Sequence, residues 1–97
     1  MKYKVLDKYI KLIESFLKNE IGVAEFEKKY FKTFLNDPDE KELDEESFTI
    51  LNDLFESVDC YWHECKPGEE TDFEISEEQL RVDTQKALQG LYFLKRS

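Results

Sequence analysis

Hydrophobic and polar residues alternate with the period of an α-helix along most of the chain. Steps of three and four residues separate the apolar positions of the first segment, which are Leu6, Tyr9 or Ile10, Ile13, and Phe16 or Leu17. This spacing places them on one helical face, so we predict a helix over residues 3–20. The same pattern predicts a helix over residues 23–35. Asn36-Asp37-Pro38 ends it, because the residue before a proline avoids the helical region.

Two further helices are predicted in the second half. Steps of three, four, three and four residues separate the apolar positions of the third segment, Phe48, Leu51, Phe55, Val58 and Trp62, and predict a helix over residues 45–65. Lys66-Pro67-Gly68 and a polar stretch follow. The last stripe predicts a helix over residues 77–95 and consists of Leu80, Thr84, Ala87, Leu88, Leu91 and Leu94. Four amphipathic helices with short connections predict an all-α fold, an antiparallel four-helix bundle forming a single domain over residues 1–97.

Local signals at the predicted helix starts support these boundaries. Ser76 with Gln79 three residues later reads as a full capping box, and Ile75 is placed to pack against Leu80. Asp44 is predicted to cap the third helix, and Gly22 occupies the cap position of the second.

Composition narrows the class of protein further. The 97 residues include 14 basic and 23 acidic side chains, a net charge of −9, and 40% hydrophobic residues, so we expect one small core rather than a disordered chain. The sequence contains no apolar run of the ~20 residues that cross a bilayer and no signal peptide, so a cytoplasmic location is expected. Cys60 and Cys65 are expected to be free thiols.

The negative charge is concentrated in one part of the chain. Residues 37–78 hold 17 acidic side chains against Lys41 and Lys66, a net of −15, whereas the remainder carries +6. The helix dipole accounts for acidic residues at helix starts but not for those in mid-helix. On a helical wheel the residues opposite the third stripe are Asp53, Glu56, Cys60, His63 and Glu64, while Asp59 flanks the core side. Such a surface repels nucleic acids and anionic membranes and attracts a basic protein.

Catalytic chemistry finds no support in the sequence. Cys60-x-x-His63-x-Cys65 invites a zinc site, but a structural zinc needs four ligands and no second pair exists. Exposed carboxylates on a convex helix stay ionised at neutral pH and are poor general acids. We therefore predict no catalytic residue, no metal site and no cofactor. Among the aromatic residues, Trp62 and Phe73 are candidate interface anchors, and Tyr61 is open between the core edge and an interface.

Three runs carry a family resemblance. They are Ile21-Gly22-Val23-Ala24-Glu25-Phe26-Glu27-Lys28-Lys29-Tyr30, Ile50-Leu51-Asn52-Asp53-Leu54-Phe55-Glu56-Ser57-Val58-Asp59-Cys60-Tyr61, and Ile75-Ser76-Glu77-Glu78-Gln79-Leu80-Arg81. Together they resemble the bacterial self-protective colicin-like immunity family. That family includes the immunity protein of colicin D and proteins paired with contact-dependent inhibition toxins.

The resemblance implies a four-helix protein that binds a cognate nuclease toxin, in the best-known members a tRNA-cleaving one, and covers its active cleft with acidic side chains. The motif positions it carries over are Asp53, Glu56, Asp59 and Tyr61. Their neighbours complete a candidate partner-binding set with His63, Glu64, Glu69, Glu70 and Asp72. We expect a monomer that forms a 1:1 complex and contacts neither nucleic acid nor membrane.

Two other classes of function remain open from the sequence. An acidic helical adaptor or DNA-mimic regulator would bind a DNA-binding protein through the same negative surface. A small metal-binding enzyme would require zinc to co-purify in stoichiometric amount.

Overall fold

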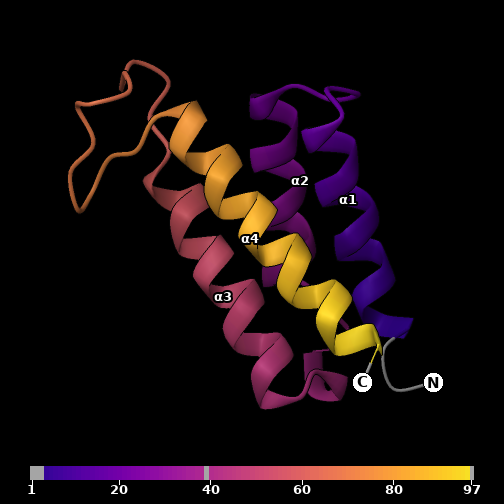
Figure 1. Ribbon diagram of the computed structural model, residues 1–97. Coiled ribbons are helices and arrows are strands. Elements are labelled where there is room, and N and C mark those ends of the chain that lie inside the picture. The colour runs from indigo at the N-terminus through magenta and orange to yellow at the C-terminus, as the bar shows by residue number, and fades with distance from the viewer. Residues whose placement is uncertain (1–3, 39, 97) are drawn as a thin grey trace.

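The computed structural model describes residues 4–38 and 40–96, which form a bundle of four α-helices (Figure 1). A 3₁₀ turn, η1 (Lys4–Leu6), leads into α1 (Asp7–Leu17), and α2 (Val23–Leu35) follows. A second 3₁₀ turn, η2 (Glu40–Glu42), precedes α3 (Glu45–Cys60) and α4 (Glu77–Arg96). Successive helices run in opposite directions, and α1 to α4 pack in a closed ring in chain order. The predicted all-α antiparallel bundle is confirmed.

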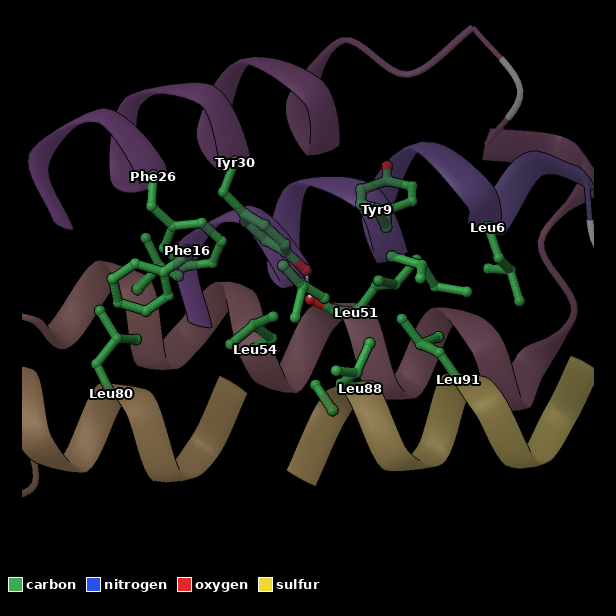
Figure 2. Close-up of a cluster of buried hydrophobic side chains, with 14 of the residues drawn as sticks. Leu6, Tyr9, Phe16, Phe26, Tyr30, Leu51, Leu54, Leu80, Leu88 and Leu91 are labelled. Carbon is green, nitrogen blue, oxygen red and sulfur yellow. Dashed lines mark hydrogen bonds between the residues drawn. The ribbon is translucent and has the colours of Figure 1, made fainter. Parts of the chain in front are cut away.

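Aromatic rings from α1 and α2 fill one half of the core, and leucines from α3 and α4 fill the other (Figure 2). The rings of Phe16 and Phe26 stack with centroids 4.3 Å apart. Tyr30 is fully buried, and its hydroxyl donates to the carbonyl of Leu51 at 2.6 Å, which joins the two halves. This hydrogen bond therefore fixes the position of α3 along α2.

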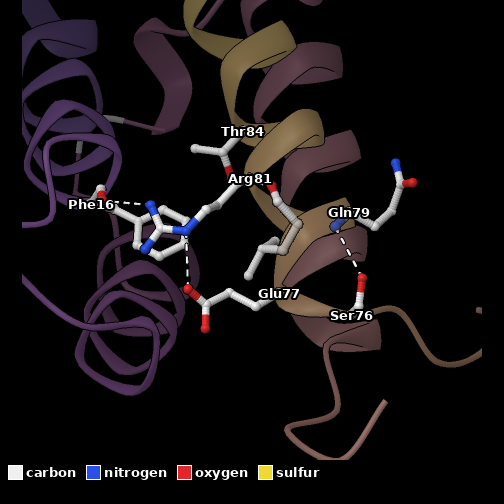
Figure 3. A network of polar contacts seen from close by, with 7 residues as sticks. Phe16, Ser76, Glu77, Gln79, Arg81 and Thr84 are labelled. Atoms are coloured by element: carbon white, nitrogen blue, oxygen red, sulfur yellow. Dashed lines mark hydrogen bonds and ion pairs between the residues drawn. The ribbon is translucent and has the colours of Figure 1, made fainter. Parts of the chain in front are cut away.

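Side-chain caps begin α3 and α4 where the sequence places them. The Asp44 carboxylate accepts from the Ser47 amide at 2.8 Å. The Ser76 hydroxyl accepts from the Gln79 amide at 3.1 Å (Figure 3). Gly22 occupies the cap position of α2 with an extended backbone. The prediction of a full capping box is wrong, because the Gln79 side chain donates to Asp83 at 2.9 Å instead of returning to Ser76.

Arg81 fastens the start of α4 to the end of α1. Its guanidinium lies 4.3 Å from the Phe16 ring centroid, and Nη1 donates to the Phe16 carbonyl at 3.1 Å. Nε donates to Glu77 at 3.0 Å, one helical turn earlier (Figure 3). A planar guanidinium makes all three contacts at once, so this end of α4 is well fixed.

Helix α3 ends at Cys60, five residues before the predicted boundary at 65. Tyr61 is extended, with φ −63° and ψ 130°, and pairs with Ile75 in an isolated parallel bridge. The Ile75 amide donates to the Cys60 carbonyl at 2.9 Å, and the Trp62 amide donates to the Ile75 carbonyl at 3.1 Å. These bonds to the segment before α4 satisfy backbone groups that further helical turns would have used.

The buried face of α3 also differs from the predicted stripe. Its buried residues are Ser47, Leu51, Leu54 and Val58. Phe48, which was predicted to be core, is 38% exposed, and Trp62, which continued the stripe and was a candidate interface anchor, is 43% exposed. Phe48 and Phe55 lie at the edge, where both rings contact Phe34 of α2. Rings from α1 and α2 fill most of the centre, so the space that remains for α3 takes the smaller side chain of Leu54.

Helix α1 is shorter than predicted, since the prediction covered residues 3–20. Residue 3 lies outside the described residues, and the helix ends at Leu17. Asn19 follows in a left-handed conformation with φ 62°, which asparagine tolerates better than most residues. At the other end of the bundle, Lys95 of α4 donates to Asp7 of α1, so the start of α1 and the end of α4 lie together (Figure 1).

None of the helices in residues 4–38 and 40–96 combines the length and apolarity that a membrane crossing requires.

Candidate functional site

Exposed carboxylates run along the outside of α3, through the loop of residues 61–76, and onto the start of α4. We call residues 61–76 the α3–α4 loop. It extends away from the helices at one end of the bundle (Figure 1). The exposed acidic residues along this path are Glu45, Glu46, Asp53, Glu56, Asp59, Glu64, Glu69, Asp72, Glu74, Glu77 and Glu78. We call this set the acidic surface.

Some acidic residues of the segment 37–78 do not contribute to this surface. The Asp37 side chain is only 1% exposed and accepts hydrogen bonds from Lys8 and from the Tyr9 hydroxyl. Asp44 is partly buried and caps α3. The negative charge displayed to a partner is therefore smaller than the sequence count of −15 suggests.

Asp53, Glu56 and Asp59 all lie exposed on α3. The expectation that Asp59 flanks the core side is wrong, because the buried face is centred on Leu51, Leu54 and Val58. Burial raises the pKa of the Cys60 thiol, and the negative charges of Asp59 and Glu56 raise it further. Both carboxylates therefore lie close enough to Cys60, at the end of α3, to influence its thiol.

The later part of the α3–α4 loop returns to contact the end of α3. The Cys60 thiol donates to the carbonyl of Asp72 at 3.8 Å, a weak sulfur hydrogen bond. The Asp72 side chain is exposed, and its backbone lies next to the end of α3. The loop thus brings the backbone of one predicted site residue, Asp72, to the end of α3.

Tyr61, Trp62 and His63 meet the first turn of α2. Tyr61 is partly buried, and burial, followed by the charges of Glu77 and Glu27, raises the pKa of its hydroxyl. The Trp62 and His63 rings lie 4.4 Å apart. A cavity of about 340 Å³ opens here, lined by Val23, Ala24, Glu27, Tyr61, Trp62 and His63. Glu27 was not among the predicted site residues, because it lies 34 positions before Tyr61 in the sequence.

His63 and Glu64 lie in the α3–α4 loop and not on a helical face, which corrects their predicted placement. The His63 Nε2 is 4.0 Å from a carboxylate oxygen of Glu64, and both side chains are exposed. Because α3 ends at Cys60, Cys60 and His63 do not share a helix. Within the described part of the chain, no three or more His, Cys, Asp or Glu side chains are grouped as a metal site would require.

Hydrogen bonds inside the loop occupy Glu70. Its carboxylate accepts from the Ser76 hydroxyl and from the Gly68 amide, and these bonds lower its pKa. Glu69 accepts from the Lys66 amide at 3.3 Å. Burial raises the pKa of the Cys65 thiol, and the charges of Glu70, Glu74 and Glu69 add to this. Glu70 thus shapes the loop, whereas Asp72 is presented to solvent.

Asp83 of α4 is a candidate residue that sequence reasoning missed. Its carboxylate accepts from the Ser57 hydroxyl and from the Gln79 side chain, each at 2.9 Å. It lines a cavity of about 280 Å³ between α3 and α4, together with Ile50, Asp53, Leu54, Ser57, Lys86 and Ala87. The acidic segment defined from the sequence ends at Glu78, before Asp83. The sequence did contain one signal for Asp83, because Gln79 and Asp83 are spaced i,i+4 beside the buried stripe of α4 and can therefore pair on one face.

Comparison with known proteins gives one match. The family model for bacterial self-protective colicin-like immunity matches residues 4–91. No curated protein and no solved structure matches the chain.

Proposed function

The chain belongs to the bacterial self-protective colicin-like immunity family, and from this premise we propose that it inhibits a cognate nuclease toxin by covering the toxin's basic active-site cleft. Membership of the family makes it an immunity protein that neutralises a toxin. The proposed toxin is a tRNA-cleaving nuclease of the colicin D or contact-dependent inhibition type. The proposed complex is 1:1 and forms in the cytoplasm.

The acidic surface is the observation that carries this proposal. A ribonuclease cleft is positively charged because it holds RNA phosphates, and carboxylates on a stiff helix bundle complement it. Within the acidic surface, Asp53, Glu56 and Asp59 stand on a regular helix whose position is set by core packing. The backbone that carries these carboxylates is held in place before binding, so little backbone freedom is lost on association.

The proposed contact set follows from the same geometry. Tyr61 and His63 would contribute ring contacts beside the carboxylates of the α3–α4 loop, which come from Glu64, Glu69 and Asp72. Glu70 would act indirectly, because its bonds to Ser76 and Gly68 hold the loop in shape.

Binding to the toxin across a range of salt concentrations tests the proposal. The probe is the nuclease domain of the toxin encoded beside this chain, purified with its catalytic residue replaced. Titration calorimetry should give one site per chain and an affinity that falls as sodium chloride rises, since salt screens complementary charges. Co-expression with the active domain should also restore growth. An affinity that does not change with salt concentration contradicts the electrostatic mechanism. Failure to bind the domain or to protect cells contradicts the choice of toxin.

A further inference from the structure

The cavity between α3 and α4 combines an apolar floor with two carboxylates. Ile50, Leu54 and Ala87 supply the floor, and Asp53 and Asp83 stand on α3 and α4 respectively. The volume of about 280 Å³ is sufficient for one long side chain. We call this space the α3–α4 cavity. The two helices that form it lie side by side in Figure 1.

A second cavity lies beside this one between the same two helices. Ile50 also lines this second cavity of about 620 Å³, whose other lining residues include Glu45, Glu46 and Gly90. A Cβ added at Gly90 would lie 2.9 Å from the Ile50 Cδ1 atom, so α4 passes close to Ile50 at this point. Both cavities therefore combine apolar lining residues with carboxylates of α3.

Asp83 is fixed before any partner arrives. Its two oxygens accept from Gln79 and Ser57, and both bonds leave the negative charge uncompensated. Within the described residues, neither Asp53 nor Lys86 forms an ion pair. Lys86 at the cavity edge supplies one positive charge against the two carboxylates. The cavity thus has an excess of negative charge and a hydrophobic lining, which suits a side chain with an aliphatic stem and a cationic head.

We propose that the α3–α4 cavity receives an arginine or lysine side chain from the toxin, with the stem against Ile50, Leu54 and Ala87 and the cation between Asp53 and Asp83. This inference rests on the proposed function and specifies which group of the partner enters which part of the surface. It extends the contact region from the outside of α3 onto α4.

Two single substitutions with opposite expected effects test the inference. Asp83→Asn keeps the size of the side chain but removes one charge, and should weaken binding of the inactive toxin domain by about tenfold or more. Lys86→Gln removes the competing cation and should strengthen binding. Glu25→Gln is the matched control for Asp83→Asn, because Glu25 is exposed on α2, diagonal to α4 in the ring, and both substitutions remove one negative charge.

The result separates this inference from the proposed function. If the wild-type chain binds the toxin domain and Asp83→Asn and Lys86→Gln bind as Glu25→Gln does, the cavity assignment is overturned while the function stands. Thermal unfolding of each variant shows whether the bundle is intact. If Asp83→Asn proves to be unfolded, its loss of affinity says nothing about the cavity. Lys86→Gln then decides, since a purely structural defect does not tighten binding.

A second arm needs no toxin. N-acetyl-arginine methylamide is titrated into the ¹⁵N-labelled chain, with the neutral citrulline analogue as control. Amide shifts specific to arginine should gather around the cavity residues and diminish in Asp83→Asn. Arginine-specific shifts confined to the α3–α4 loop, or equal shifts with citrulline, would count against the cavity as a cation site.

Discussion

The carboxylate of Asp37 joins α1 to the connection that follows α2. It accepts a hydrogen bond from Tyr9 at 2.6 Å and another from Lys8, and its side chain is 1% exposed. Burying a charged carboxylate costs free energy unless hydrogen-bonding or oppositely charged partners compensate it. Nothing in the sequence distinguishes Asp37 from the exposed acidic residues after it, because its partners come from a helix 28 and 29 positions earlier.

Removal of this carboxylate should destabilise the bundle strongly. Asp37→Ala leaves the Tyr9 hydroxyl without this acceptor, and we expect a loss of about 3 kcal/mol in the free energy of unfolding. Asp7→Ala is the comparison, because the Asp7–Lys95 pair is exposed and exposed pairs contribute about 0.2–1 kcal/mol. Urea unfolding followed by circular dichroism measures both. Equal losses would show that burial does not distinguish the two pairs.

Tyr30 should make the protein sensitive to alkaline pH. Burial, with a smaller effect of Tyr9, raises the pKa of Tyr30 far above its ordinary value, so the folded state keeps the proton that the unfolded state releases above pH ~10. Stability is therefore fully present below pH ~10 and should fall above it, by about 1.4 kcal/mol per pH unit for this group.

The matching variant is Tyr30→Phe. It should lose about 1 kcal/mol at pH 7, because the bond to the Leu51 carbonyl is gone. Its stability should then decline less steeply between pH 10 and 11.5. Tyr61 and Tyr92 also have raised pKa values, so some decline should persist. Parallel slopes for wild type and variant in urea unfolding would contradict the role given to Tyr30.

At the scale of elements, the helices follow from short-range signals but the end of α3 does not. Periodicity and the caps at Gly22, Asp44 and Ser76 place the starts of α2, α3 and α4 correctly. The end of α3 depends on a pairing between Tyr61 and Ile75, which are 14 positions apart. The apolar character of Trp62 continued the helical pattern past the true end, and this placed His63 and Glu64 on the wrong element.

The α3–α4 loop depends on one backbone conformation. Gly68 has φ 92°, which L-amino acids rarely adopt, and its amide donates to Glu70 at 2.8 Å. Gly68→Ala should lower the free energy of unfolding by about 1–3 kcal/mol, although an added Cβ would meet no atom within 4 Å.

Gly22 provides a matched control for that substitution. An added Cβ also meets no atom within 4 Å there, but the backbone is extended and the residue caps α2. Gly22→Ser should therefore stabilise the protein by about a few tenths of a kcal/mol through a new cap. Thermal unfolding compares the two, and equal effects would show that the conformation of Gly68 carries no strain.

For the whole molecule, the sequence predicts the surface better than it predicts individual contacts. The concentration of charge in residues 37–78 predicts an acidic side, and the exposed carboxylates of this segment lie mainly on α3, the α3–α4 loop and the start of α4. That they form one partner-binding side stays a prediction. The internal bonds of Glu70 and the inclusion of Asp83 could not be inferred, because both depend on how the loop and α4 pack against α3. Like charges on one side repel each other, so the surface lowers the stability of the free protein.

Charge reversal on α3 tests the surface as a whole. Asp53→Lys combined with Glu56→Lys should weaken binding to the inactive toxin domain by about 3 kcal/mol or more, because both charges would then oppose a positive cleft. The helical content should not change, since both side chains are exposed. The control is Glu40→Lys with Glu42→Lys, which alters net charge equally but lies in η2. Retained protection in cells carrying the α3 reversal would show that these two residues do not contribute to toxin binding.

The contact between Asp7 and Lys95 also determines how the molecule is best handled. Because the start of α1 and the end of α4 meet at the end of the bundle away from the α3–α4 loop, a fluorophore, a bead or a fused carrier attached there leaves that loop open. A short linker could also join the two ends directly. New termini could then be cut between α1 and α2, giving a circular permutant with all four helices and the acidic side retained.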